Sequence, residues 1–176
     1  GDRKGRIRIK RPALVGYAYG VLKDRRFSLV VRAVFDGGGN VRSLIQALES
    51  LGTSPVLVTS PEGMASLTHL FFPGQGAFGD CMTKLRNLDL VDPIVEWIQA
   101  DKPFFGICIG YQLLFESSEE SPGIDGLSIL EGKVIRFVEE GFKVPHMGWN
   151  SVSLNKAHPL TQDIEDKSYF YFVHSY

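Results

Sequence analysis

One stretch constrains the fold of this chain more than any other, the segment PFFGICIGYQLLFESSEE at residues 103–120. Its apolar start, PFFGI, is typical of a buried central strand, and the residues after Cys108 are expected to form a helix. Gly106 and Gly110 stand two residues before and after Cys108, which is the Gly-x-nucleophile-x-Gly pattern of a nucleophile elbow. A Cβ at either glycine would clash between strand and helix. The spacing therefore predicts a tight strand–turn–helix unit that carries a thiol.

The elbow pattern makes Cys108 a candidate nucleophile. An elbow cysteine projects at the carboxyl end of its strand, beside the first N–H groups and the positive dipole end of the following helix, and both favour a thiolate. A buried structural cysteine on an ordinary strand-to-helix turn would give the same local sequence, since free cysteines are often part of a core. The elbow alone leaves both interpretations open.

A second loop, PGQG at residues 73–76, can supply the hydrogen-bond donors of an acyl-transfer site. Gly74 and Gly76 allow unusual backbone angles, so N–H groups around Gln75 can point into a site. A cysteine that attacks an acyl carbon needs such donors for the developing oxyanion. We expect them from Gly74, Gln75 and Gly76 and from the amide of Ile109. The alternative for this loop is a simple strand-to-helix turn.

Strand and helix patterns alternate from residue 28 to residue 117. Strands are expected at 29–35, 55–59 and 67–72, and helices at 41–51, with Asn40 as N-cap, and at 90–100. The alternation predicts an α/β fold with a mostly parallel sheet and helices on both faces. Loops at 36–40, 73–80 and 106–112 would then meet at the carboxyl ends of the strands, where such sheets bind ligands.

After residue 120 the chain becomes β-rich. ILEGKVIRF, KVPHMGWNSVSL and KSYFYFVHSY are strand-like segments with Gly and Pro between them. His146 and Trp149 are expected in a Pro/Gly-rich loop of the second segment. Trp149 there is either an exposed interface anchor or a core residue.

Composition fits a single globular domain. The chain has 176 residues, and 44% of them are hydrophobic, which is enough for a substantial core. Its net charge is −1. No apolar run is long enough to cross a membrane, and no signal-peptide pattern follows the basic start. Cys81 and Cys108 make no disulfide framework, so a cytoplasmic protein is expected.

The charge is unevenly distributed. Residues 1–27 hold nine Lys/Arg and two Asp/Glu, whereas residues 28–176 hold ten and eighteen. We expect residues 1–27 to be a basic extension outside the core domain at 28–176. A short strand around Ile7 and Ile9, or an arm that binds nucleic-acid phosphates, are the alternatives.

Several stretches together resemble the class I glutamine amidotransferases, and within them the glutaminase subunits of imidazole glycerol phosphate synthases. The matching stretches are GGGNVRSLIQALESLG (37–52), PGQGAFGDCM (73–82), GICIGYQLLFESSEE (106–120), GLSILEGKVIRF (126–137), VPHMGWNSV (144–152) and YFYFVHSY (169–176). The resemblance implies a flavodoxin-like fold and a glutaminase that acts through a cysteinyl thioester. It also implies a heterodimer with a cyclase subunit that receives the ammonia, with no cofactor, metal, nucleic acid or membrane.

The resemblance also implies roles for individual residues. Cys108 would be the nucleophile, and the oxyanion hole would comprise Gly74, Gln75, Gly76 and Ile109. Glutamine would be bound by Gln112, Glu120, His174, Ser175 and Tyr176, the last three through their backbone. The cyclase-facing residues would be Gly38, Gly39, Asn40, His146 and Trp149.

The sequence departs from the family pattern in two places. Phe35-Asp36 stands where the family usually has Asp-Tyr. The family's general base is a His followed by Pro-Glu beyond the FVHSY segment, whereas the sequence ends at Tyr176. We expect none of His69, His146, His158 and His174 to replace this base, and we expect the chain as given to be a poor glutaminase with an incomplete last strand and helix.

Two other functions stay open at this point. The first is the glutaminase subunit of another class I amidotransferase, such as that of anthranilate synthase. The synthase that co-purifies with the chain would distinguish this function. The second is a non-catalytic member that only binds a partner, and it would need no reactive thiol.

Overall fold

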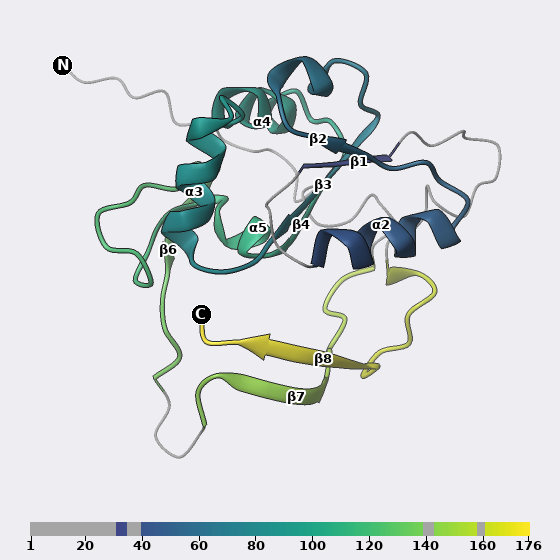
Figure 1. Cartoon of the computed structure of the whole chain (residues 1–176). Coiled ribbons are helices and arrows are strands. Elements are labelled where there is room, and N and C mark those ends of the chain that lie inside the picture. The colour runs from purple at the N-terminus through teal and green to yellow at the C-terminus, as the bar shows by residue number, and fades with distance from the viewer. Residues whose placement is uncertain (1–30, 35–39, 139–142, 158–160) are drawn as a thin grey trace.

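A parallel sheet forms the centre of the molecule. The structure is a computed structural model of the chain and describes residues 31–34, 40–138, 143–157 and 161–176. Its main sheet has four parallel strands in the order β2-β1-β3-β4. These strands are β1 (Val31–Val34), β2 (Val56–Val58), β3 (His69–Gly74) and β4 (Phe104–Cys108), shown in Figure 1. The predicted α/β class with a parallel sheet is confirmed.

Helices cover both faces of this sheet. α2 (Asn40–Ser50) joins β1 to β2, a short 3₁₀ helix, η2 (Pro61–Met64), joins β2 to β3, and α3 (Phe78–Asn87) and α4 (Val91–Gln99) join β3 to β4. The chain leaves β1 toward one edge of the sheet and β3 toward the other. Right-handed crossovers therefore place α2 on the face opposite to α3 and α4, as Figure 1 shows. Among the described residues, no helix has the length and apolar character needed to span a bilayer.

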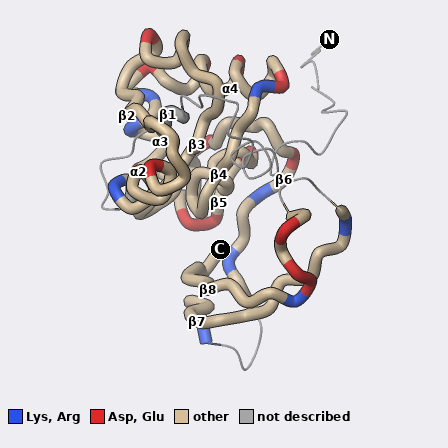
Figure 2. Tube along the Cα trace, turned by 90° about the vertical axis from the view of Figure 1, so that its right-hand side faces the viewer, with Lys and Arg blue, Asp and Glu red and all other residues tan. Residues whose placement is uncertain are grey.

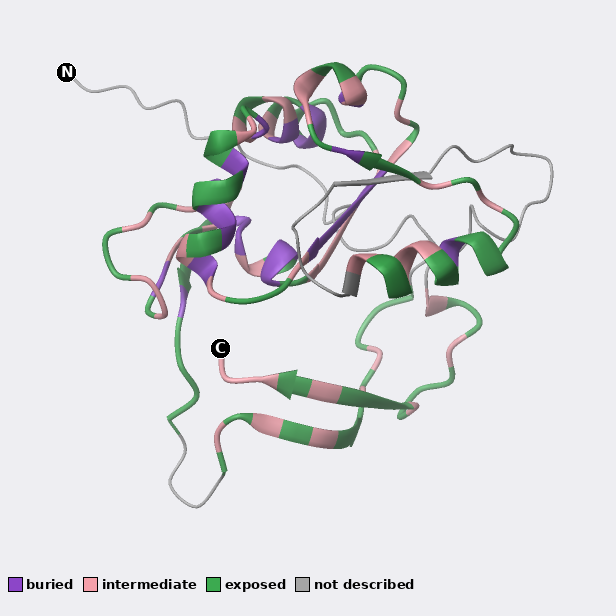
Figure 3. Ribbon diagram, in the orientation of Figure 1, coloured by how far each residue is buried: buried purple, intermediate pink, exposed green. Residues whose placement is uncertain are grey.

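The period of two along β3 and β4 builds the core. Leu70, Phe72 and Phe104 point toward α3 and α4 and belong to the main hydrophobic cluster, whereas Phe71 and Phe105 form a ring pair of their own, 5.7 Å apart. Figure 3 shows the buried residues concentrated between this sheet and the two helices. The fully buried side chains on this side of the sheet include Phe78 and Met82 on α3, Leu90 at the N-cap of α4, and Ile94 on α4.

Helix α3 was not anticipated from the sequence, although α2 and α4 agree with the expected helices to within a residue at each end. Its N-cap residue is Ala77, which offers no side-chain cap, and Gly79 stands in its first turn. The caps come from elsewhere, because Glu120 and Ser121 accept hydrogen bonds from the amides of Phe78 and Gly79. A cap that lies 42 residues away leaves no local signal of a helix start.

A helix follows Cys108 as expected, but it is only one turn long. α5 spans only Ile109–Gln112, and the chain then forms β5 (Phe115–Ser118), which pairs with β6 (Leu130–Val134). The reason is competition for backbone carbonyls. The carbonyl of Leu113 accepts from Leu127 N–H, and that of Leu114 accepts from the amides at 129 and 130, so neither can accept the bonds that would continue a helix.

Two further boundaries differ from expectation. β3 runs from His69 to Gly74 rather than from 67 to 72, so the first half of the PGQG loop belongs to the strand. His146 and Trp149 lie in a strand and not in a loop. That strand, β7 (His146–Ser151), pairs antiparallel with β8 (Tyr169–His174) along its whole length, and this continuous ladder satisfies the backbone despite Gly148.

The β7–β8 hairpin lies apart from the main sheet, below α2 in Figure 1. Neither strand contains Asp, Glu, Lys or Arg, so both are uniformly tan in Figure 2. The hairpin, together with β5 and β6, confirms the expected β-rich C-terminal part. The predicted extension at 1–27 and the loop residues Gly38 and Gly39 lie outside the described residues.

Candidate active site

Cys108 occupies a strained position at the end of β4. It is the last residue of the strand and the residue immediately before α5, with φ of 55° and ψ of −121°. A residue with a Cβ adopts this part of backbone space only when its surroundings enforce it, at a cost of about 1–3 kcal/mol. Cys108 is exposed, whereas Cys81 is buried on α3. The alternative of a buried structural cysteine at 108 is therefore wrong.

Three glycines enforce this geometry. A Cβ at Gly106 would lie 2.9 Å from Tyr111 Cα, and a Cβ at Gly110 would overlap the carbonyl oxygen of Phe72. Gly74 is the register partner of Cys108, and a Cβ there would lie 2.7 Å from the amide nitrogen of Gly110. Strand and turn can approach this closely only without those side chains, which confirms the steric reason expected for Gly106 and Gly110.

A pocket of about 380 Å³ opens where β3 and β4 end. Cys108 and Ile109 line it from the elbow, Gly74, Gln75 and Gly76 from the PGQG loop, and Val173–Tyr176 from the end of the hairpin. The remaining lining residues are Leu44, Pro73, Ile107, Gln112 and Glu120. The structure therefore brings together all the residues assigned to the nucleophile, the oxyanion hole and glutamine binding, whose individual roles stay predictions.

The PGQG loop is held from both sides. Pro73 and Gly74 pair with Ile107 and Cys108 in the sheet, so the loop and the elbow share a fixed register. Beyond the sheet, the carbonyl of Gln75 accepts a weak hydrogen bond from the Cys81 thiol at 3.6 Å. The PGQG loop is thus held in a fixed position next to Cys108.

Gln112 presents an unmet acceptor next to the elbow. Its Nε2 donates to the main-chain oxygen of Tyr176 at 3.3 Å. Because that oxygen can only accept, the NH₂ group must face Tyr176, and Oε1 points elsewhere. Oε1 is buried and has no hydrogen-bond partner within the described part of the chain. An unsatisfied buried acceptor costs about 1–3 kcal/mol, and a ligand N–H group would satisfy it.

Glu120 lies where α3 begins. One of its carboxylate oxygens accepts from Phe78 N–H at 2.8 Å, a favourable place for a negative charge at a helix N-terminus. Glu120 also lines the pocket. Glu120 therefore has a structural contact that the sequence did not reveal, in addition to the glutamine-binding role expected of it.

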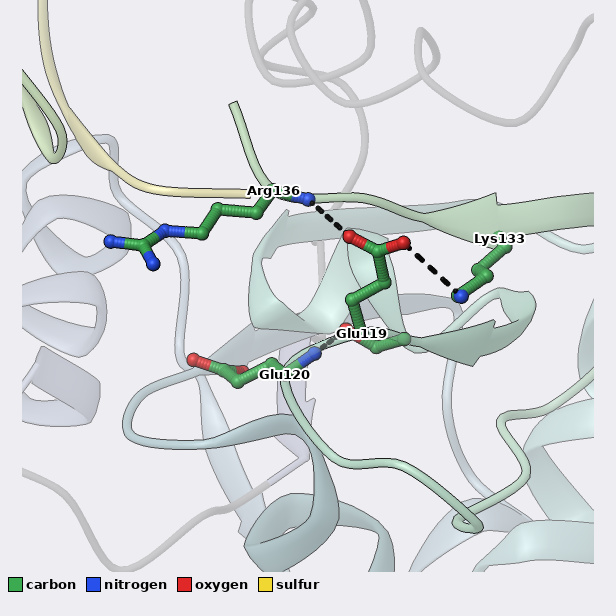
Figure 4. A network of polar contacts seen from close by, with 5 residues as sticks. Glu119, Glu120, Lys133 and Arg136 are labelled. Atoms are coloured by element: carbon green, nitrogen blue, oxygen red, sulfur yellow. Dashed lines mark hydrogen bonds and ion pairs between the residues drawn. The ribbon is translucent and has the colours of Figure 1, made fainter. Parts of the chain in front are cut away.

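The neighbouring Glu119 points the opposite way, toward β6 and the segment after it. Its carboxylate accepts from Arg136 N–H at 3.1 Å and forms an ion pair with Lys133 at 3.2 Å (Figure 4). The Arg136 amide first, and Lys133 second, lower the pKa of Glu119 below its usual 4.5. These contacts fix the backbone from which Glu120 extends.

The histidines occupy different places. His69 begins β3, at the end of the strand away from the pocket, and burial lowers its pKa. His174 lines the pocket, but its Nδ1 contacts the Tyr176 oxygen at 3.1 Å and its Nε2 contacts His146 Nδ1 at 3.4 Å. Both ring nitrogens are thus engaged, and neither is left for the Cys108 thiol. His158 lies outside the described residues.

Trp149 belongs to an exposed apolar surface. It is 69% exposed on β7 and contacts the ring of Tyr171 on β8 edge-on, with 5.6 Å between ring centroids. The core alternative for Trp149 is therefore wrong, and its place in a partner interface stays a prediction. Of the other expected interface residues, Asn40 begins α2 and His146 begins β7.

Sequence reasoning missed Leu44, the capping role of Ser121 and the contact between His146 and His174. The last of these depends on strand pairing, because the two histidines are directly opposed in the β7–β8 register. Only a predicted hairpin with this register would have placed them on one face.

Comparison with known proteins agrees with this geometry. The class-I glutamine amidotransferase family matches residues 33–176. The imidazole glycerol phosphate synthase subunit HisH of Pseudomonas putida is 47% identical over 152 residues, covering 82% of this chain and 71% of that protein. Proteins of the same name from Sulfurimonas denitrificans and Methanosarcina barkeri are each 44% identical, covering 78% and 80% of this chain and 68% of their own length.

A solved structure supports the fold. The crystal structure of a glutamine amidotransferase superposes with a TM-score of 0.61 at 22% identity, covering 81% of this chain and 70% of that one. A strained elbow cysteine, a glycine-rich loop in register with it, and a family match over most of the sequence lead to one conclusion: the chain belongs to the class I glutamine amidotransferases.

Proposed function

We propose that this chain is the glutaminase subunit of an imidazole glycerol phosphate synthase, a cytoplasmic enzyme of histidine biosynthesis. The observation that carries the proposal is Cys108, which is held at positive φ on the elbow and open to the same pocket as the loop Gly74–Gly76. The identity of 44–47% to subunits of that name supports this member of the family over the glutaminase of anthranilate synthase.

The proposed reaction proceeds in two steps at Cys108. Its sulfur attacks the side-chain carboxamide carbon of glutamine and the thiol proton passes to the leaving nitrogen. The C–N bond then breaks, so that ammonia departs and a cysteinyl thioester remains. Water then cleaves the thioester, which releases glutamate and restores the thiol. We assign the oxyanion donors to the Ile109 amide and to the Gly74–Gly76 loop, where loss of one donor typically costs about 10²–10³ in rate.

The rest of the pocket suits the other end of glutamine. Gln112 Oε1 is a buried acceptor for an N–H group, and the Glu120 carboxylate complements the α-ammonium group. The backbone of His174–Tyr176 is proposed to bind the α-carboxylate, as the family resemblance implies. The N–H groups of glutamine would thus meet the acceptor oxygens of Gln112 and Glu120.

The proposed partner is a cyclase subunit that receives the ammonia. The exposed face of the hairpin offers Met147, Trp149, Tyr169, Tyr171 and Val173, all more than half exposed. Aromatic residues with no charged neighbours in either strand are characteristic of the buried centre of a protein interface. Gly38, Gly39, Asn40 and His146 are proposed to extend this interface.

The test is covalent labelling with a chloroketone analogue of L-glutamine. The analogue should modify Cys108 in the 176-residue chain, as mapped by mass spectrometry, and L-glutamine should slow the reaction whereas D-glutamine should not. Iodoacetamide, which needs no binding site, serves as the control for thiol exposure, and the Cys108→Ala variant gives the background.

Two outcomes would refute the proposal. Modification of Cys81 with Cys108 untouched would remove Cys108 as nucleophile. Labelling of Cys108 without protection by L-glutamine would show a reactive thiol in a pocket that does not bind glutamine, and the chain would then belong with the members that only bind a partner.

A further inference from the structure

A chain of polar contacts connects the hairpin to the pocket. His146 and His174 are opposed in the β7–β8 register, with His146 Nδ1 3.4 Å from His174 Nε2. His174 Nδ1 lies 3.1 Å from the main-chain oxygen of Tyr176. The same oxygen accepts from Gln112 Nε2 at 3.3 Å. Four residues from three separate parts of the sequence are thus linked in one series.

For a His174 ring that carries one proton, the acceptor at Tyr176 sets the direction of the other bonds in the series. The Tyr176 oxygen can only accept, so His174 must carry its proton on Nδ1, and Nε2 of the neutral ring is then an acceptor. His146 must therefore donate from its own Nδ1. One proton on His146 Nδ1 selects the tautomer of His174, and that tautomer is the one able to hold the Tyr176 oxygen.

Aromatic contacts hold both imidazoles in place. His146 stacks on Phe172, with ring centroids 5.3 Å apart and an interplanar angle of 23°. Phe137 meets the ring of His174 edge-on at 4.8 Å, and its N–H donates to the carbonyl of Ser175 at 3.0 Å. Neither ring can rotate freely, so the contacts between them are preorganised.

The last member of the series is Gln112, whose side-chain oxygen has no hydrogen-bond partner in the described chain. The Tyr176 oxygen holds the NH₂ group of Gln112 and thereby directs Oε1, which is buried and has no partner in the described chain. Gln112 is the last residue of α5, the turn that begins directly after Cys108. The orientation of its carboxamide decides whether the pocket presents an acceptor or a donor beside the thiol.

We propose that His146 is a positioning residue for glutamine binding: it fixes the His174 tautomer, which holds the Tyr176 oxygen and so orients Gln112 Oε1 toward a substrate N–H group. This inference rests on the proposed glutaminase function of the pocket. It gives His146 a role inside the subunit, separate from the partner-facing role expected from the sequence.

Substitutions at His146 distinguish the contribution of its ring packing from that of its hydrogen bond. His146→Phe keeps a ring that can stack on Phe172 but removes the donor. His146→Asn keeps a donor near the position of Nδ1, and His146→Gln places it near the position of Nε2 instead. Ser151→Ala, at the exposed end of the same strand, is the control for a change elsewhere on the hairpin.

The measurement is the concentration dependence of Cys108 modification by the glutamine chloroketone in the 176-residue chain, which separates its binding constant KI from its limiting rate. For His146→Phe and His146→Gln, KI should rise about fivefold or more, the effect of losing one hydrogen bond. For His146→Asn and Ser151→Ala, KI should stay within about twofold of the wild-type value. The iodoacetamide rate should not change in any variant.

The inference is overturned if His146→Phe leaves KI unchanged, or if His146→Asn is as defective as His146→Gln. The second comparison decides the matter even if His146→Phe fails to fold. A wild-type chain that L-glutamine does not protect would instead refute the proposed function, and this inference with it.

Discussion

Gly110 lies against the main-chain carbonyl of Phe72, with no space between them for a Cβ atom. Phe72 is a core residue of β3, and Gly110 is in the single turn that follows the nucleophile. This one contact couples the packing of the sheet to the backbone angles of Cys108. The reactive position is therefore maintained by the hydrophobic core beneath it.

The first prediction follows from that contact. Gly110→Ala should destabilise the protein by at least about 3 kcal/mol, because the new methyl group meets backbone that cannot move without disturbing the core. Gly52→Ala is the control, since Gly52 has open space where its Cβ would be, and only its positive φ of 79° opposes the substitution. It should cost only about 1 kcal/mol. Equal losses in urea unfolding would contradict the steric argument.

The second prediction concerns the hairpin surface. Trp149→Ala should weaken binding of the proposed cyclase by about 2 kcal/mol, a typical loss at an interface anchor, with little change in melting temperature. The contrast is Trp97→Ala, because Trp97 is only 4% exposed and its loss should cost about 3–5 kcal/mol of stability. Calorimetric titration with the cyclase measures the first effect. Unchanged affinity in Trp149→Ala would exclude this surface as the docking site.

The third prediction is a pH dependence of stability. Burial lowers the pKa of His69 below its usual 6.5, so between the lowered value and 6.5 the unfolded chain binds a proton that the folded chain does not. The free energy of unfolding should therefore fall as pH falls through this window, and rise again toward neutral pH. In His69→Gln this contribution should disappear. Urea unfolding at pH 5 and 7.5 tests it, and an identical pH slope in both proteins would rule it out.

The fourth prediction concerns residues 1–27. Their deletion should leave the melting temperature of 28–176 nearly unchanged, because the expected core domain needs no strand from this basic segment. Differential scanning calorimetry of the two chains is the measurement. A drop of many degrees would instead mean that the extension contributes a strand or packs on the core.

The sequence by itself determined the parts of this protein that depend on short-range geometry. The period of two along β3 and β4, and the glycines at 106 and 110, specify a parallel sheet with a nucleophile elbow at its carboxyl edge. These features could be predicted because each one is the steric consequence of neighbouring residues. The meeting of the PGQG loop with Cys108 followed from the rule that the carboxyl ends of parallel strands meet at one edge.

Only the tertiary structure decided the features whose hydrogen-bond partners are distant in the chain. α3 begins where Glu120 provides its cap, 42 residues away, and α5 ends after one turn because residues 127–130 take the carbonyls of Leu113 and Leu114. His146 meets His174, 28 residues away, only because the β7–β8 register opposes them. A backbone or side-chain group binds the partner that folding brings to it, and local sequence does not specify that partner.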